Sequence, residues 1–361
     1  MSPIELLRVL GPLALAVVAS FVLDRLCARK GLLPPGFREP FRRWGAMFVV
    51  AVLLWIAVFA PLGNIGLGVE MDVTQVHPVQ LFLLHALMLL VLGTWFLLGF
   101  GGSAGAYRPL PSPPPSPLPS PVPAAVPVAG EPAGDPGVAL EAASEAVIEP
   151  PPASPLPEGV AAPLAEPVPA MAALPPPVSL GRRFAEQFGL VAPSVPREIG
   201  LGLTLGLGAW VAVLVAVMLI GGLIVMLGGE DTLPQRPPQV VHWIAGLPLL
   251  LRCLVSLSAG VVEELFFRGF LQPRVGIVLS TAFFVLAHFS YGQPFMLIGI
   301  TILSLIYAFL VRWRQSVWAA IAAHVLFDAI QLLVVIPAAL RLLESQGRGA
   351  ETSALLGLWP G

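Results

Sequence analysis

Long, almost uninterrupted runs of apolar residues dominate the pattern along this chain. A helix needs about 20 mostly apolar residues to cross a hydrocarbon core of roughly 30 Å. Eight segments approach or reach that length, at residues 9–23, 46–62, 79–100, 199–227, 253–272, 275–291, 295–311 and 317–340. The pattern therefore predicts an all-α fold, a polytopic transmembrane helix bundle of about eight spans.

Proline interrupts this pattern between the third and fourth runs. More than half of the 40 prolines fall within residues 101–180, together with many alanines and few aromatic side chains. Such a composition buries too little apolar area to offset its chain entropy. We therefore expect a disordered linker at 103–180, which divides the chain into a three-span N-terminal region, 1–102, and a second membrane region, 181–361.

Two local patterns follow the linker. Phe184 and Phe188 share one side of residues 182–198, with Arg182 and Arg183 elsewhere, which is typical of a helix on the membrane surface. Glycines then recur along the fourth apolar run, a composition that predicts close packing against a neighbouring helix.

Arginine and lysine set the expected orientation, because cytoplasmic loops retain positive residues. The loop after the first run holds Arg25, Arg29, Lys30, Arg38, Arg42 and Arg43, whereas residues 63–78 hold none. Alternation then predicts a multi-pass cell-membrane protein with a cytoplasmic linker and both termini outside. Four arginines run against this assignment: Arg236, Arg252, Arg341 and Arg348.

The amino-acid composition limits the classes of partner that this protein can bind. Apolar residues make up 57% of the chain and charged residues 11%, with a formal net charge of -2 and a single lysine, Lys30. This excludes the basic surface that nucleic-acid binding needs and indicates membrane lipid and a membrane-associated peptide or protein as partners. The linker could also dock a cytoplasmic partner. Cys27 and Cys253 are too far apart in sequence and surroundings to indicate a disulfide framework.

Charged residues within the fifth run are the first sign of chemistry. Such groups cost several kcal/mol in a membrane and occur mainly where they face a protein interior or take part in function. Glu264 and Arg268 are four residues apart and share a helix face, with the acid on the favoured N-terminal side. Glu263 points about 100° away. Burial disfavours the charged form of such a carboxylate, which suits a general base.

Histidines in two later runs extend this cluster. His288 lies late in the sixth run, and His324 and Asp328 share one face of the last. Counted from the cytoplasmic ends at about 1.5 Å per residue, Glu263 lies about 15 Å deep, His288 about 20 Å and His324 about 12 Å. Each group alone has a structural interpretation, as an ion pair or an interhelical hydrogen bond. Together they favour a functional site, because every buried polar group adds a desolvation cost.

The order of these motifs resembles the CPBP family of intramembrane proteases (CAAX protease and bacteriocin-processing, also called Abi). The pattern is E-E-x-x-x-R, then F-x-x-x-H, then H-x-x-x-N or D. The chain supplies it as Glu263, Glu264, Arg268, Phe284, His288, His324 and Asp328, within roughly 249–340. The resemblance implies an intramembrane endopeptidase in which Glu263 and the two histidines activate water, with Asp328 as oxyanion donor or ligand.

Two questions about the mechanism stay open at this level. Glu263, His288, His324 and Asp328 would suit zinc or another divalent metal, but a metal-free glutamate mechanism uses the same side chains. Ionised Asp328 cannot donate a hydrogen bond, so a ligand or His-orienting role fits it better than an oxyanion role.

Two other classes of function compete with a protease. A transporter or proton relay also uses buried Glu and His residues, although the chain has no convincing internal repeat. A non-catalytic membrane scaffold could bind a partner through the linker. His85, within the third run, is interpreted as a structural hydrogen bonder, and His77 and His242 as loop residues without chemistry.

Overall fold

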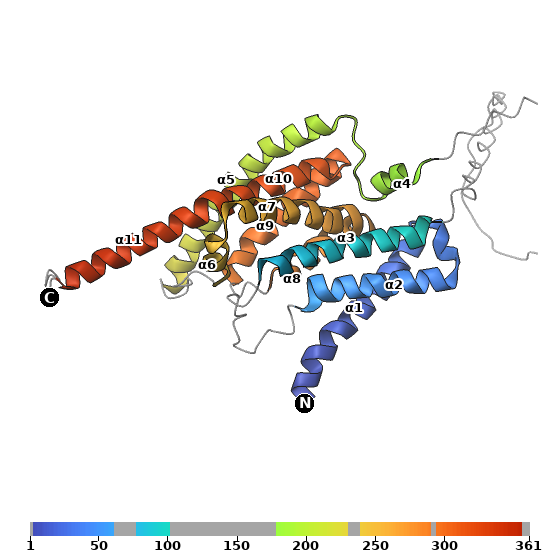
Figure 1. Cartoon of the computed structure of the whole chain (residues 1–361), viewed down its shortest axis with the longest axis horizontal. Helices are drawn as coiled ribbons and strands as arrows, with labels where there is room; N and C mark the ends of the chain where they lie inside the picture. Colours follow the sequence, from blue (N-terminus) through green and yellow to red (C-terminus); the bar gives the residue numbers. More distant parts are fainter. Residues whose placement is uncertain (1–2, 61–76, 102–177, 230–238, 290–293, 356–361) are drawn as a thin grey trace, which may run out of the picture. The chain divides into compact units, whose positions relative to one another are not determined.

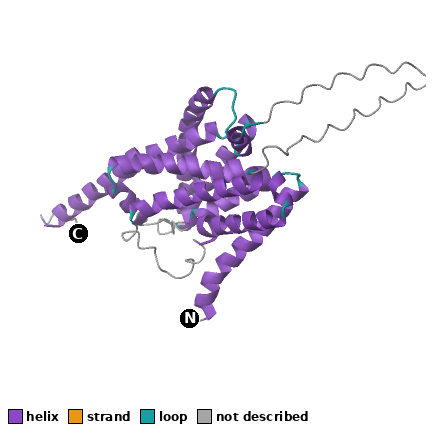
Figure 2. Ribbon diagram, turned by 45° about the vertical axis from the view of Figure 1, so that its right-hand side comes forward, coloured by secondary structure: helices purple, strands orange, loops and turns teal. Residues whose placement is uncertain are grey.

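The computed structural model describes residues 3–60, 77–101, 178–229, 239–289 and 294–355. Within these ranges the regular structure is helical and includes no strand (Figures 1 and 2). The predicted all-α bundle is therefore confirmed. Residues 102–177, which hold nearly all of the predicted linker, lie outside the described residues, so its disorder stays a prediction.

The N-terminal region contributes a packed group of helices. They are α1 (Pro3–Arg29), the short 3-10 helix η1 (Pro35–Arg38), α2 (Pro40–Leu54), its π-helical continuation η2 (Trp55–Phe59) and α3 (Pro78–Phe100). α1 packs on α2, and α2 packs on α3. An ion pair of 2.6 Å between Asp24 and Arg43 joins the ends of α1 and α2.

The second region surrounds one central helix. Its elements are α4 (Leu180–Gln187), α5 (Val195–Gly228), α6 (Gln239–Gly246), α7 (Leu249–Glu263), η6 (Glu264–Leu271), α8 (Gln272–Ala287), α9 (Pro294–Arg314), α10 (Trp318–Ile330), η8 (Gln331–Val335) and α11 (Ile336–Leu355). α10 contacts α5, α7 and α9. Residues from several parts of the chain are thereby brought to one helix.

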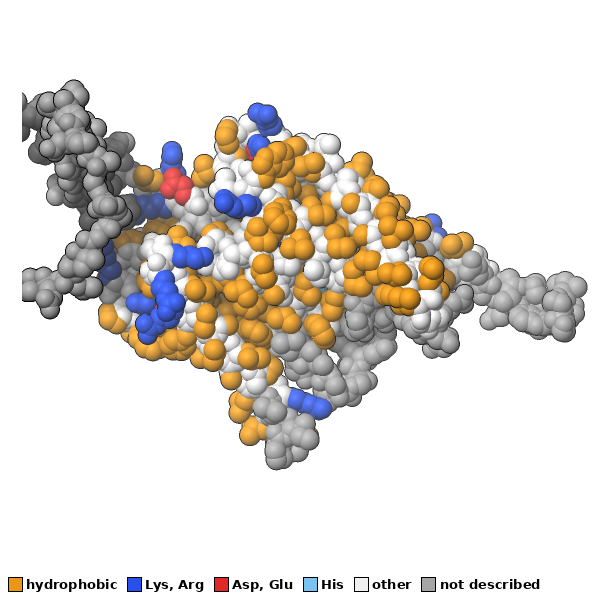
Figure 3. All heavy atoms as spheres, turned by 180° about the vertical axis from the view of Figure 1, so that it is seen from behind, with side chains coloured by type: hydrophobic (Ala, Val, Ile, Leu, Met, Phe, Trp, Pro, Cys, Tyr) orange, Lys and Arg blue, Asp and Glu red, His pale blue; other side chains and the backbone are white. Residues whose placement is uncertain are grey.

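Six helices in the described part of the chain are long and apolar enough to cross a membrane. Hydrophobic side chains cover much of the molecule's face in Figure 3, as expected of a multi-pass membrane protein. The two other predicted spans, 253–272 and 275–291, correspond to the helical run of α7, η6 and α8, which ends at Ala287. This run carries the buried charges and bends at Gly276, whose φ of 86° is left-handed.

The helix after the linker is held by aromatic packing within the protein. Phe184 and Phe188 extend from α4, and Phe188 is fully buried, with its ring centroid 6.5 Å from that of Trp95 and 6.3 Å from that of Phe270. The amphipathic pattern predicted a helix on the membrane surface, but its apolar side faces α3 and η6. A stripe of phenylalanines cannot by itself distinguish a lipid environment from a protein groove.

Close helix approaches bring α5 and α7 against α10. A Cβ atom added to Gly206 would lie 2.7 Å from Ala323 Cα, and one added to Gly260 would lie 2.5 Å from Val325 Cγ2. Only glycine permits such approaches without displacement. The predicted glycine-mediated packing of the fourth apolar run is thus confirmed at Gly206, and Gly260 brings α7 equally close to α10.

The three N-terminal helices pack directly on the helices that carry the charged cluster. The ring centroids of Phe59 and Phe283 are 5.9 Å apart, and those of Trp95 and Phe270 are 4.9 Å apart, both in edge-to-face geometry. One hydrophobic cluster includes residues of α1, α2, α3, η6 and α8. The described residues therefore form one compact unit.

Candidate active site

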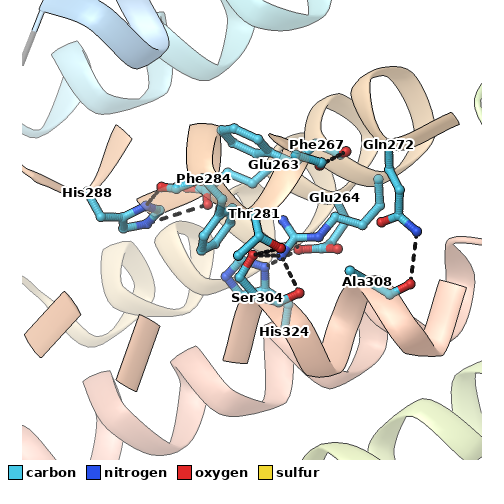
Figure 4. A network of polar contacts seen from close by, with 12 residues as sticks. Glu263, Glu264, Phe267, Gln272, Thr281, Phe284, His288, Ser304, Ala308 and His324 are labelled. Carbon is cyan, nitrogen blue, oxygen red and sulfur yellow. Dashed lines mark hydrogen bonds and ion pairs between the residues drawn. The ribbon is translucent and has the colours of Figure 1, made fainter. Parts of the chain in front are cut away.

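Two adjacent carboxylates of one helix are divided between two histidines of other helices. Glu263 Oε2 lies 3.7 Å from Nε2 of His288, at the end of α8. Glu264 Oε1 lies 2.9 Å from Nδ1 of His324, on α10. Figure 4 shows these side chains converging from three helices. The structure thus brings the predicted acids and histidines together, but it assigns one histidine to each acid.

The local backbone explains how neighbouring acids reach different partners. α7 ends at Glu263, and the π-helical stretch η6 begins at Glu264. A π-helical segment changes the helix register locally and is frequent at functional sites. Gly260, one turn earlier, lets α10 approach α7 closely enough for His324 to reach Glu264.

Arg268 forms the predicted ion pair with Glu264 and is held on several sides. Its Nη1 lies 3.2 Å from Glu264 Oε1, and both side chains are almost fully buried. Nη2 donates to the hydroxyl and the carbonyl of Ser304, at 3.1 and 3.3 Å. The guanidinium carbon lies 4.2 Å from the ring centroid of Phe284, a cation–π distance. Glu264 and Arg268 are therefore fixed parts of the core.

His288 is oriented by the helix that carries it. Its Nδ1 lies 2.7 Å from the Phe284 carbonyl oxygen, one turn earlier, and its ring stacks on Phe284 with centroids 4.5 Å apart. Because a carbonyl oxygen only accepts, Nδ1 carries the proton of this hydrogen bond. Nε2 is then directed toward Glu263.

His324 lies between two carboxylates. Its Nδ1 contacts Glu264, and its Nε2 lies 3.5 Å from Oδ2 of Asp328, one turn later on α10. The Tyr307 ring stacks on the imidazole with centroids 5.2 Å apart. These contacts fix the plane of the ring and the direction of both nitrogens.

The cluster has a sealed layer and an accessible one. Side-chain exposure is 0% for Glu264, 1% for Arg268 and 5% for His324. It is 18% for Glu263, 15% for His288 and 24% for Asp328. Glu263, His288 and Asp328 are therefore partly exposed, whereas Glu264 and Arg268 are buried behind them as support.

Several polar residues of the site were not predicted from the sequence. Ser304 on α9 accepts from Arg268 and also donates to the Thr281 hydroxyl at 3.3 Å. Single hydroxyl residues within apolar runs give no motif, so no pattern identified them. His85 is buried on α3, with Nδ1 3.0 Å from the Ser258 hydroxyl, as a structural hydrogen bonder would be. It also lies near enough to Glu263 for their charges to interact.

The candidate metal ligands do not converge on one point. Within the described residues, no three His, Cys, Asp or Glu side chains gather as a metal ion requires. Glu263, His288, His324 and Asp328 occur instead as two pairs, Glu263 with His288 and His324 with Asp328. This arrangement does not fit a bound metal as it stands. The reaction steps considered below therefore use only the chain's own groups.

The fold and the site define a polytopic membrane protein with a cluster of Glu, His, Arg and Asp side chains within its helix bundle. In a comparison with protein families, residues 245–330 match the family described as "Type II CAAX prenyl endopeptidase Rce1-like". This part of the chain is therefore similar to Rce1-like domains, and it contains all six of the polar residues predicted for the site. The predicted resemblance to CPBP-type CAAX proteases is confirmed.

A curated relative and the solved structures add little to this assignment. The Bacillus subtilis (strain 168) protein named "Uncharacterized protein YpbD" is 29% identical over 77 residues, 21% of this chain. The matched part covers 41% of that protein's length, less than two thirds of it. No solved structure matches the chain significantly.

Proposed function

We propose that this protein is an intramembrane endopeptidase that hydrolyses a peptide bond in a membrane-associated peptide or protein. One observation carries the proposal: Glu263 and His288, from two helices, face each other in the accessible layer. A sealed Glu264–Arg268–His324 group lies directly behind them. The Rce1-like match over the same residues supports it.

In the proposed reaction, Glu263 takes a proton from a water molecule held between its carboxylate and the His288 ring. The water oxygen attacks the carbonyl carbon of the substrate and forms a tetrahedral intermediate. The C–N bond then breaks, and Glu263 returns its proton to the leaving amine nitrogen. The products are a carboxylate and an amine, and Glu263 is again ready to accept a proton.

The other site residues would assist without exchanging that proton. His324 has a carboxylate on each side of its ring, so a ring with two N–H groups would be held in place by Glu264 and Asp328. In that form it provides positive charge where the oxyanion develops. Asp328 is then an orienting residue, in agreement with its ionised state being unable to donate.

The substrate class follows from the surroundings of the site. A buried centre within a membrane bundle favours a substrate that partitions into the bilayer. The matched family is described as a CAAX prenyl endopeptidase family. For this chain we propose the broader class of membrane-anchored peptides as substrates. We also propose that the protein's linker lies on the cytoplasmic side of the membrane and that both of its termini lie outside.

The test is comparative proteomics of membranes that contain the wild type or the Glu263→Gln variant, with new peptide N-termini as the readout. Glutamine keeps the shape of Glu263 but cannot act as a base, so we expect cleavage products from the wild type alone. Glu186→Gln is a matched control, because Glu186 is a half-exposed acid on α4. Unchanged products in the Glu263→Gln sample would refute the proposal.

The same cluster would also suit a proton relay, and the variants distinguish the two functions. Proton flux across proteoliposomes that depends on Glu263, in a preparation that cleaves no peptide, would favour the relay. If the Glu263→Gln variant yields the same cleavage products and the same proton flux as the wild type, Glu263 has neither role.

A further inference from the structure

The two imidazoles of the site have no N–H group left to stabilise an oxyanion. Both ring nitrogens of His324 face carboxylates, Glu264 at 2.9 Å and Asp328 at 3.5 Å. In His288, Nδ1 is bonded to a carbonyl oxygen of its own helix, and Nε2 faces Glu263. The oxyanion of the proposed reaction needs a hydrogen-bond donor aimed at it. Another group of the site must therefore supply that donor.

Tyr307, on α9, carries a buried hydroxyl group without a hydrogen-bond partner. The residue is 0% exposed, and its Oη has neither a donor nor an acceptor in hydrogen-bond contact among the described residues. A hydroxyl that is removed from water without a partner destabilises the folded protein. Buried polar groups are therefore nearly always paired in native structures, and one that is not calls for an explanation, such as a part in the reaction.

The surroundings of Tyr307 place this hydroxyl within the site. Its ring stacks on the His324 imidazole at an interplanar angle of 28°, with centroids 5.2 Å apart. The guanidinium carbon of Arg268 lies 5.8 Å from the centroid of the same ring. Asp328 is the charged group that acts most strongly on the hydroxyl, followed by Glu264. The hydroxyl therefore lies beside the imidazole that supplies positive charge in the proposed reaction.

The register of α9 against η6 brings Tyr307 to this position. Arg268 donates to Ser304 and Gln272 donates to Ala308, so both pairs are 36 residues apart and the two segments run parallel. Ser304, Tyr307 and Ala308 are spaced by three and four residues, so they share the buried face of α9. Tyr307 is thereby held between η6 and α10, as a preorganised donor must be.

We propose that the Tyr307 hydroxyl is a catalytic group that donates a hydrogen bond to the oxyanion of the tetrahedral intermediate. This role rests on the proposed function, because it requires a substrate carbonyl beside His324. As the water oxygen bonds to the carbonyl carbon, a C=O electron pair moves to the carbonyl oxygen, and the neutral phenol donates to that oxygen while keeping its proton. The pair returns when the C–N bond breaks. Asp328, whose side chain is 24% exposed, is the neighbour past which the carbonyl reaches this hydroxyl.

The experiment compares the purified full-length wild type with Tyr307→Phe, which removes the hydroxyl and keeps the ring. The probe is a synthetic peptide that spans a cleavage site found in wild-type membranes. We expect kcat to fall about 100- to 1,000-fold, the usual effect of removing one oxyanion donor, while KM changes less than about twofold. A phosphinic analogue of the same peptide, which carries a charged oxygen at the tetrahedral centre, should bind the variant about tenfold more weakly or worse.

Thermal unfolding separates this role from a structural one. Because the hydroxyl makes no hydrogen bond in the folded protein, Tyr307→Phe should melt at the wild-type temperature or above it. Trp210→Phe is a matched control, because the buried indole N–H of Trp210, on α5, also has no partner and is not part of the cluster. Its kcat should equal that of the wild type.

The outcomes distinguish the role of Tyr307 from the proposed function. A wild type that cleaves no peptide would overturn the proposed function and this role with it. With an active wild type, full activity of Tyr307→Phe would overturn the role of Tyr307 alone. If the variant melts at a lower temperature, binding of the phosphinic analogue to the folded variant decides, and unchanged affinity would overturn the role.

Discussion

The Glu264–Arg268 pair allows a quantitative test of how the site is supported. Replacing Arg268 by Met introduces an apolar side chain that is also long and unbranched. It leaves Glu264, which is fully buried, without its cation. It also removes two hydrogen bonds to Ser304 and the contact with the Phe284 ring. We expect a loss of about 3–5 kcal/mol in the free energy of unfolding, the cost of breaking a buried pair.

The double variant separates lost pairing from lost packing. In the double variant Arg268→Met/Glu264→Gln, no buried acid lacks a partner. Its loss in the free energy of unfolding should therefore be smaller than the sum of the losses of the two single variants, by about 0.5–3 kcal/mol. The measurement is reversible unfolding in mixed detergent and dodecyl sulfate micelles, followed by tryptophan fluorescence.

An exposed pair of the same type provides the control. Arg182 and Glu186 are also four residues apart, at 2.9 Å, with side chains 69% and 48% exposed. Arg182→Met should therefore cost about 0–1 kcal/mol. If Arg268→Met costs no more than Arg182→Met, or if the losses of the two buried variants simply add, the supporting pair does not exist as described.

Three further predictions concern the reaction and its surroundings. Asp328→Asn should reduce cleavage substantially, since the negative charge 3.5 Å from His324 is lost; an Asn variant as active as the wild type across a pH–rate profile would contradict the orienting role. Deletion of residues 106–177 should leave cleavage of a small peptide largely intact, and Phe100 and Val178 line one cavity, so a short Gly/Ser linker can join the ends; a folded but inactive deletion variant would count against this. Because the acids and histidines are arranged in pairs, dialysis against a chelator should leave activity unchanged, and metal analysis of the active fraction checks this; loss of activity that zinc restores would show the opposite.

The helices were predictable because a membrane span needs many apolar residues in succession. The Glu264–Arg268 pair was predictable for a similar reason, since four residues make slightly more than one helical turn. Spans with several charges were harder to place. The run 249–287 contains Arg252, Glu263, Glu264, Arg268 and Arg274. No periodicity in its sequence marks its irregularities, the π-helical η6 and the left-handed Gly276.

The partners of each histidine could not be deduced from the sequence. Depth along the spans indicated that His288 and His324 could meet the acids, but the rotation of each helix about its axis decides which acid each one faces. That rotation depends on contacts such as Gly260 against Val325 and Tyr307 against His324, which join residues far apart in the chain. Ser304 and Thr281 were not predicted because single hydroxyl residues within apolar runs form no motif.

The packing of α5 and α3 also bears on how this domain is inherited and divided. The segment recognised by family similarity, 245–330, excludes Gly206, which packs on Ala323, and Trp95, which packs on Phe270. Expressed alone, that segment would expose these surfaces to lipid or to other chains. The unit that similarity recognises is therefore smaller than the unit that must fold. Transfer of residues 245–330 of this chain into another protein should succeed only when the helices that carry Gly206 and Trp95 move with them.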